Sequence, residues 1–243
     1  MRPFLLLSIR AEPEAAEEEH DAFARFLEVG SAGLERRQLG VAALGRVDLG
    51  EWSGIVLGGG AFCVSDPEAT KTAEQRRTEE DLATLLDQVV EADFPFLGAC
   101  YGIGTLGRHQ GGVVDRSHPE PVGPCSVTVS AEGTLDPLFA GVPQTFAAYG
   151  GHKEALAVVP DGATVLATSA ACPVQAFRVG ANVYATQFHP ELDLDGIRTR
   201  IAVYAGHGYF DPAEVVALQT AAAAVQVDRP GSLLRNFARL HAR

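Results

Sequence analysis

The chain has 243 residues, of which 47% are hydrophobic and 21% are charged, and its formal net charge is −12. This is the composition of a globular protein that is long enough to bury a large core without disulfides or a structural metal. The acidic balance argues against binding to nucleic acid or to an anionic membrane surface, because the arginine pairs Arg36-Arg37 and Arg76-Arg77 stand alone and form no basic patch.

The N-terminal stretch MRPFLLLSIR predicts a buried strand over Phe4–Ile9 rather than a signal peptide, because its apolar run is short and is followed by no cleavage site. No apolar run approaches the roughly 20 residues that a membrane-spanning helix needs. The acidic block Glu12–Asp21 predicts the exposed start of a helix that continues through Leu27. The cysteines have neither C-x-x-C nor zinc-finger spacing, so we expect a reduced, cytoplasmic protein.

Two further apolar runs, Gly54–Leu57 and Phe94–Gly98, predict buried strands, and Glu74–Glu91 between them has helical spacing of its leucines and valines. This strand–helix–strand order is typical of an α/β fold. Short strands separated by turns follow, and we expect them at Ser126–Ser130, Thr145–Tyr149, Thr164–Thr168, Val174–Val179 and Asn182–Phe188. The prediction is a doubly wound, flavodoxin-like α/β domain with a mostly parallel central sheet and antiparallel strands late in the chain.

The pattern after residue 192 is helical. Asp211, Pro212 and Glu214 have the order of a helix N-cap, a first-turn proline and a capping-box acid, and an alanine-rich helix to about Val225 follows. A last helix is expected over Leu233–Leu240. We therefore predict a domain over residues 1–192 and a helical extension over 193–243 packed on the same domain; docking of a partner protein is the alternative role for the extension.

The stretch FPFLGACYGIGTLG supports two interpretations. Gly102, Gly104 and Gly107 spell the G-x-G-x-x-G pattern of a dinucleotide site, which should close the first strand of a unit and be followed by an acid at the end of the next strand. Here the pattern follows the third strand or a later one. The nearest acid, Glu120, lies in a proline-rich segment that we expect to be a loop.

A nucleophile elbow explains the same stretch better. In such an elbow a reactive side chain sits at a sharp turn between a strand and a helix, and small neighbours such as Gly98, Ala99 and Gly102 leave room for the turn. The helix that begins after Cys100 directs its positive end at the sulfur, which favours the reactive thiolate. A merely buried cysteine is the alternative, and it suffices for Cys63, Cys125 and Cys172 but leaves the glycines around Cys100 unexplained.

The late stretch NVYATQFHPEL supplies a base and a carboxylate. In extended chain His189 and Glu191 point to the same side, so Glu191 can orient the imidazole while its other nitrogen faces a nucleophile. His152 and Glu154 have the same spacing, and two such pairs together would suit a zinc or iron site. Nothing in the spacing requires the four side chains to meet, so we expect no metal.

Several motifs in order resemble the class I, triad-type glutamine amidotransferases, and in particular the glutaminase domain of GMP synthase and its stand-alone relatives. The motifs are IVLGGGAF, GACYGIGTLG, GHKEALAVVPDGATVLATSAACPVQAF and QFHPEL, and the likeness covers about Phe4 to Leu192. The resemblance implies a glutaminase without a cofactor. It also implies glutamine as substrate and an ammonia-accepting synthetase as partner, and a homo-oligomer is compatible with it.

The resemblance also implies roles for individual residues. Cys100 would attack the amide to form a thioester, His189 would transfer protons, and Glu191 would orient His189. The oxyanion hole would consist of the backbone N–H of Tyr101 and of a glycine in the Gly58–Gly60 turn, Gly59 or Gly60. The substrate pocket would be lined by Gly104, Tyr149, Gly150, Gly151 and His152.

The sequence departs from the family pattern at two positions of these motifs, and the second departure leaves the substrate open. Gly60 or Ala61 stands where relatives have proline, and Gly104 stands where they have a glutamine that helps to hold the substrate. A γ-glutamyl hydrolase or peptidase with the same triad is therefore an alternative, so that the substrate is either glutamine or a γ-glutamyl compound. A non-catalytic regulatory relative is the third hypothesis.

Overall fold

The computed structural model describes residues 2–206, 208 and 210–243. Its helices are α1 (Pro13–Phe26), α2 (Ala73–Glu91), α3 (Tyr101–His109), α4 (Ala131–Leu135), α5 (Leu194–Val203), α6 (Val215–Ala223) and α7 (Gly231–His241). Its strands are β1 (Phe4–Ser8), β2 (Leu34–Gln38), β3 (Ile55–Leu57), β4 (Phe96–Ala99), β5 (Val113–Asp115), β6 (Glu120–Val129), β7 (Thr145–His152), β8 (Ala155–Val158), β9 (Thr164–Thr168), β10 (Ala176–Val179) and β11 (Val183–Thr186). Short 3₁₀ turns lie at Ser31–Gly33, Leu49–Glu51, Glu68–Thr70, Pro137–Phe139 and Pro212–Glu214.

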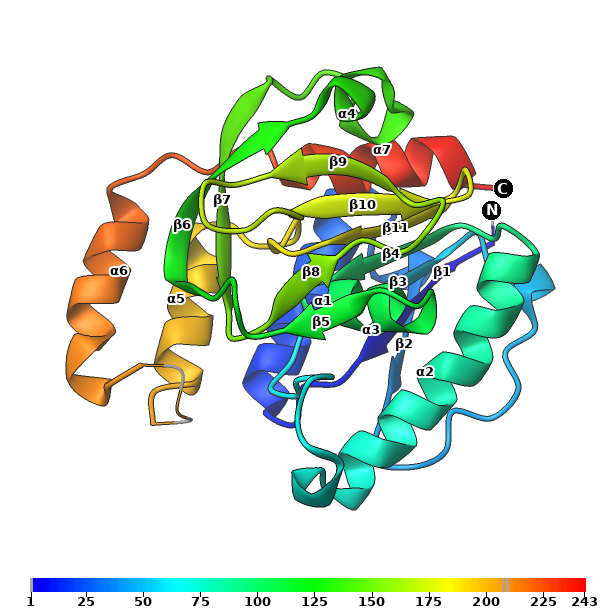
Figure 1. Cartoon of the computed structure of the whole chain (residues 1–243), viewed down its shortest axis with the longest axis horizontal. Helices are drawn as coiled ribbons and strands as arrows, with labels where there is room; N and C mark the ends of the chain where they lie inside the picture. Colours follow the sequence, from blue (N-terminus) through cyan, green and yellow to red (C-terminus); the bar gives the residue numbers. More distant parts are fainter. Residues whose placement is uncertain (1, 207, 209) are drawn as a thin grey trace.

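A nine-stranded sheet in the order β2-β1-β3-β4-β11-β10-β9-β6-β7 forms the centre of the molecule (Figure 1). The strands from β2 to β11 in this order pair in parallel, whereas the pairs from β11 to β7 are antiparallel. The predicted α/β fold, with parallel early strands and antiparallel late strands, is confirmed. The sheet is mixed, because its antiparallel half is as extensive as its parallel half.

Strand β1 explains why the N-terminal apolar run is continuous. Phe4 and Leu6 belong to one core cluster, together with residues of α1 and α7. Leu5 and Leu7 belong to a second cluster, which includes residues of α2 and α3. Successive side chains of a strand point to opposite faces of the sheet, so a strand covered on both faces needs apolar residues at every position.

Strands β2, β5 and β8 were not predicted, and the start of β6 was predicted as a loop. Strand β2 has the sequence LERRQ and lies at the edge of the sheet, where its charged side chains reach solvent. Strands β5 and β8 form a separate two-stranded sheet. Strand β6 begins at Glu120, so the segment that we expected to be a proline-rich loop is part of a long strand.

The helical segment after residue 192 lies against the rest of the chain at two places. Helices α5 and α6 stand beside β6 and β7 at the left of Figure 1, and α7 lies against α1. The capping box at Asp211 and Glu214 forms as predicted, with both hydrogen bonds present. Among the described residues, no helix combines the length and the apolar character that crossing a membrane requires.

Phe237 of α7 tests our proposal that residues 193–243 fold together with the preceding domain. Its ring is fully buried and lies 6.0 Å from the ring of Phe4 in β1, measured between centroids. Phe237→Ala should lower the free energy of unfolding by about 3–5 kcal/mol, because it removes a large buried side chain and leaves a cavity. Urea unfolding followed by circular dichroism and by the fluorescence of the single tryptophan, Trp52, measures this loss.

Leu240→Ala on the same helix is the matched control, because Leu240 is 45% exposed. It should change stability by less than about 1 kcal/mol. If Phe237→Ala shifted the circular dichroism transition but left the Trp52 transition in place, the extension would unfold on its own and the proposal of a single unit would be wrong.

Candidate active site

The candidate site is built where strands β4 and β11 end. These strands are parallel neighbours, and Ala99 at the end of β4 is paired with Thr186 at the end of β11. The chain therefore leaves both strands at the same edge of the sheet, and the backbone N–H of Cys100 donates to the carbonyl of Thr186 at 2.8 Å. This pairing brings Cys100 and the segment that carries His189 together, although they are far apart in the sequence.

Cys100 occupies a strained turn between β4 and α3. Its backbone φ is 53°, in the left-handed region that residues other than glycine rarely adopt. A conformation of this kind costs about 1–3 kcal/mol and persists only where the surrounding structure enforces it. Gly98 is required here, because a Cβ on it would lie 2.8 Å from the backbone of Gly102. The geometry is that of the predicted elbow.

His189 is held from two sides. Its backbone N–H donates to the carbonyl of Tyr149 at 3.0 Å, and its ring Nδ1 lies 2.7 Å from Oε1 of Glu191. Glu191 is completely buried. The two side chains therefore pair as the spacing in the sequence predicts, and the Nδ1 contact leaves Nε2 as the nitrogen that faces a proton donor or acceptor.

Electrostatics favours the charged form of this pair. Burial alone would lower the pKa of His189, but the charge of Glu191 and the hydrogen-bonded Cys100 outweigh burial and raise the pKa to about 9. Burial alone would raise the pKa of Glu191, but His189, Arg200 and Arg10 together lower it to about 2. At neutral pH the imidazolium of His189 lies next to Cys100, where it can stabilise a thiolate and donate a proton.

Side chains of three site residues converge beside the backbone of Gly59. A Cβ built on this glycine would lie 2.6 Å from Cε1 of His189, 3.2 Å from Cβ of Cys100 and 3.3 Å from Nη2 of Arg10. No side chain fits there, which agrees with the predicted close approach of this backbone. Tyr101 is the first residue of α3, so its N–H is one of those that have no partner within the helix.

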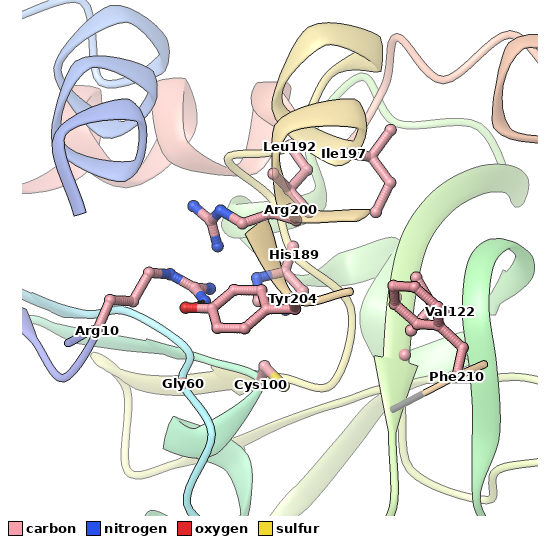
Figure 2. A pocket seen from close by; sticks show the side chains of 12 residues that line it. Arg10, Gly60, Cys100, Val122, His189, Leu192, Ile197, Arg200, Tyr204 and Phe210 are labelled. Atoms are coloured by element: carbon pink, nitrogen blue, oxygen red, sulfur yellow. Dashed lines mark hydrogen bonds between the residues drawn. The ribbon is translucent and has the colours of Figure 1, made fainter. Parts of the chain in front are cut away.

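Cys100 and His189 line a cavity with one polar side and one apolar side. Figure 2 shows Arg10 directed toward His189 from one side, with Arg200 and Tyr204 on that same side, and Val122 and Phe210 on the other side. The remaining lining residues are Gly60, Gly150, Gly151, Leu192 and Ile197. Of the sequence-predicted residues, the structure thus places Cys100, His189, Gly60, Gly150 and Gly151 around this cavity.

The polar side is a network of buried charges. Nε of Arg10 donates to Oε1 of Glu19 at 2.7 Å, and Nη1 of Arg10 donates to the hydroxyl of Tyr204 at 3.0 Å. Arg200 donates to Oε2 of Glu18 from Nη2 at 2.9 Å and from Nε at 3.2 Å. The network joins the end of β1, helix α1 and helix α5 behind the catalytic candidates.

Three predicted pocket residues lie elsewhere. The hydroxyl of Tyr149 donates to the carbonyl of Ala222 at 2.9 Å, away from the cavity. A Cβ on Gly104 would meet Val64 and the carboxylate of Glu154 rather than the cavity. The structure does not bring Tyr149, Gly104 or His152 into the lining of the cavity, so their predicted contact with substrate finds no support in the geometry.

His152 belongs to a second cluster instead. Its Nδ1 lies 2.8 Å from the carbonyl oxygen of Glu154 and its Nε2 lies 2.9 Å from Oε2 of Glu120. Within the described residues, Glu120, His152 and Cys172 form one group whose ligand atoms lie within 4.8 Å of one another, as a metal site would require. The carboxylate of Glu120 is already used by His152, by Ser169 at 2.7 Å and by Gln175, which favours a structural hydrogen-bond network.

The remaining cysteines have ordinary surroundings. Burial raises the pKa of Cys63 and of Cys125 to about 12 and that of Cys172 to about 11, so these side chains stay protonated thiols at neutral pH. Sequence reasoning missed the cavity residues on α5 and beside it, which are Leu192, Ile197, Arg200, Tyr204 and Phe210, and it also missed Arg10 and Val122. Arg10 carried a usable signal, because it directly follows an apolar strand.

Comparison with known proteins agrees with the sequence resemblance. A sequence model of the family described as glutamine amidotransferase class-I matches residues 46–202. The glutamine-hydrolyzing GMP synthase of Thermosipho africanus is 33% identical over 115 residues, which cover 47% of this chain and 22% of that protein. One of the subunits of the glutamine-hydrolyzing GMP synthase of Methanococcus maripaludis is 32% identical over 143 residues, which cover 58% of this chain and 66% of that relative.

The fold also has solved counterparts. The crystal structure of a glutamine amidotransferase from Thermotoga maritima matches with a TM-score of 0.77 and 20% sequence identity over 100% of both chains. An identity this low establishes a common fold alone. The chain spans less than a quarter of the length of the Thermosipho GMP synthase, at 22%.

The buried pair predicts a pH-dependent stability. The raised pKa of His189 means that its contribution is complete below its ordinary value of 6.5 and is lost as the pH rises through about 9. The lowered pKa of Glu191 means that its contribution is complete above 4.5 and is lost as the pH falls toward about 2. Glu191→Gln should therefore lower the free energy of unfolding most between pH 4.5 and pH 6.5. The loss should be about 3–5 kcal/mol, since the substitution breaks a buried ion pair.

Urea unfolding at a series of pH values checks this prediction, with the exposed Asp195→Asn on α5 as the control. The gap between wild type and Glu191→Gln should narrow above about pH 9. A gap that stays constant from about pH 5 to pH 10 would show that the charge interaction does not contribute.

Proposed function

Because this chain belongs to the class I glutamine amidotransferase family, we propose that it is a glutaminase, which hydrolyses the side-chain amide of glutamine and releases ammonia. The observation that carries the proposal is the convergence of Cys100 and His189 on one point beside Gly59, with Glu191 hydrogen-bonded to the far side of the imidazole at 2.7 Å. A nucleophile, a base and an orienting carboxylate in this order are the components of covalent amide hydrolysis.

In the first half of the reaction, the thiolate of Cys100 attacks the amide carbon while its proton resides on His189. The new C–S bond forms and the carbonyl oxygen becomes an oxyanion. Backbone N–H groups at Tyr101 and at the Gly59–Gly60 turn are the donors we propose for that oxyanion. The C–N bond then breaks, and the imidazolium of His189 gives its proton to the leaving nitrogen, which departs as ammonia.

In the second half, water attacks the carbonyl carbon of the thioester and passes a proton to His189. The C–S bond breaks, glutamate leaves, and the thiolate–imidazolium pair is restored. Glu191 acts throughout by holding the tautomer and the orientation of the ring. The cycle consumes one water molecule and needs no cofactor.

We also propose that a synthetase accepts the ammonia. The support is the likeness to the Methanococcus protein, whose name describes it as part of a glutamine-hydrolyzing GMP synthase. The four free cysteines suit a reducing compartment, and we propose a cytoplasmic location on that basis.

Cys100→Ala tests the glutaminase. It should lower the rate of ammonia release from glutamine at least about 1,000-fold, because the nucleophile is lost while binding is kept. Cys125→Ala is the matched control, since Cys125 is a protonated thiol that does not line the cavity. Equal rates of ammonia release in wild type and Cys100→Ala, in a glutamate-dehydrogenase-coupled assay, would exclude this function.

A γ-glutamyl amide hydrolase is a second candidate, and the apolar side of the cavity favours it. Val122, Ile197 and Phe210 form a wall that ammonia, as a leaving group, does not need. A γ-glutamyl amide of an aromatic amine would fill the space beside that wall. If γ-glutamyl-p-nitroanilide has at least about ten times the kcat/KM of glutamine, and Phe210→Ala removes that preference, the second candidate replaces the first.

A further inference from the structure

The described charged residues that line the cavity are all positive, which favours a negatively charged ligand. Among the lining residues within the described parts of the chain, Arg10 and Arg200 are cationic, and none is an aspartate or a glutamate. The acids of the network, Glu18 and Glu19, contact the arginines from behind, on the side of α1. The described lining of the cavity therefore contains two cationic residues and no carboxylate side chain.

One N–H donor group of Arg200 has no hydrogen-bond partner among the described residues. Its side chain is about 94% buried, since only 6% of it is exposed. Nε and Nη2 are used by Glu18, whereas Nη1 has no hydrogen-bond partner among the residues that the structure describes. A buried cationic donor without an acceptor is costly, and such groups in native proteins call for an explanation. A bound anion would supply the acceptor.

Arg10 presents its own remaining amino group to the reacting centre. Glu19 and Tyr204 fix Nε and Nη1, which leaves Nη2 directed at the point near Gly59 where Cys100 and His189 also converge. The guanidinium is thus oriented before any ligand binds. A pre-organised guanidinium N–H is well suited to a carboxylate oxygen, because the hydrogen bond between the two is assisted by their opposite charges.

We propose that Arg10 and Arg200 form a carboxylate-binding subsite, so that the enzyme takes ω-monoamides of short dicarboxylic acids, with glutamine as one member of the class. The inference rests on the proposed amide hydrolysis at Cys100. The amide carbon and the α-carboxyl carbon of extended glutamine lie about 5 Å apart. Cβ of Cys100 and Nη2 of Arg10 lie 3.2 Å and 3.3 Å from one point beside Gly59, so a ligand of that length at Cys100 is within reach of Arg10. No acidic side chain lines the described cavity to select for an α-ammonium group, so glutaramate, which lacks one, should be a substrate too.

Three amides separate the groups that this subsite recognises. L-glutamine has both the carboxylate and the ammonium group, glutaramate has the carboxylate alone, and 4-aminobutanamide has the ammonium group alone. The wild type should hydrolyse glutamine and glutaramate with similar kcat/KM and 4-aminobutanamide at least about tenfold less well. Arg200→Met should lower kcat/KM for the two carboxylates about 10- to 100-fold more than for 4-aminobutanamide, with the difference in KM.

Arg198→Met is the matched control, because Arg198 lies on the same helix and is exposed. Arg200→Lys should restore part of the activity on carboxylates, because it keeps the positive charge. The recovery should be incomplete, because lysine lacks the planar guanidinium group. Equal losses on all three amides in Arg200→Met would overturn the subsite and make Arg200 a positioning residue for Glu191. A wild type that hydrolyses 4-aminobutanamide as well as glutamine would overturn it too.

A binding measurement separates this inference from the proposed function. Titration calorimetry of the Cys100→Ala protein with glutaramate and with 4-aminobutanamide reports the subsite without any turnover. Binding of glutaramate alone, lost in the Cys100→Ala/Arg200→Met protein, supports the subsite even if no amide is hydrolysed. Equal binding of both compounds, or of neither, rejects the subsite, while Cys100-independent ammonia release rejects only the catalytic proposal.

Discussion

The pairing of β4 with β11 is the constraint on which the site depends. The two strands are parallel and in register up to Ala99 and Thr186, so the chain leaves both at one edge of the sheet. A slip of one residue would turn the side chains of β11 to the opposite face and shift the segment that carries His189. In the observed register, the ends of the two strands bring Cys100 and the segment that carries His189 to the same edge of the sheet.

Placing charges at this edge has a cost that the surrounding network offsets. Burial opposes the charged forms of both His189 and Glu191, and the attraction between them is what keeps them charged. Arg10 and Arg200 add to the stabilisation of Glu191, while Glu18 and Glu19 balance the arginines. A site of alternating charges can hold a reactive ion pair in a dry environment, where a single unpaired charge would destabilise the fold by several kcal/mol.

The parts of the site that sequence reasoning could predict are those whose function constrains local geometry. A nucleophile at a sharp turn needs a small residue at Gly98, and a base with an orienting acid needs alternate positions in an extended chain. Both requirements leave patterns that can be read without a structure. Strand β2 and the strand at Glu120 left no such pattern, because an edge strand tolerates charge and a bulged strand tolerates proline. His152 shares the spacing of His189, but its ring contacts the backbone carbonyl of Glu154 and the carboxylate of Glu120, and neither contact can be predicted from the spacing.

The residues that line the far side of the cavity illustrate why specificity is harder to predict than chemistry. Ile197, Arg200 and Tyr204 lie three and four residues apart, so they share one face of α5 and its C-terminal end. On a surface helix this spacing is equally expected of residues that merely pack, and nothing in the sequence indicates that the face covers Cys100. The proposed nucleophile and base are positioned by the edge of a sheet, and one fold can support many different chemistries. In our proposal the choice of amide depends on α5, and the positions on that helix are placed by long-range contacts such as the one between Arg200 and Glu18.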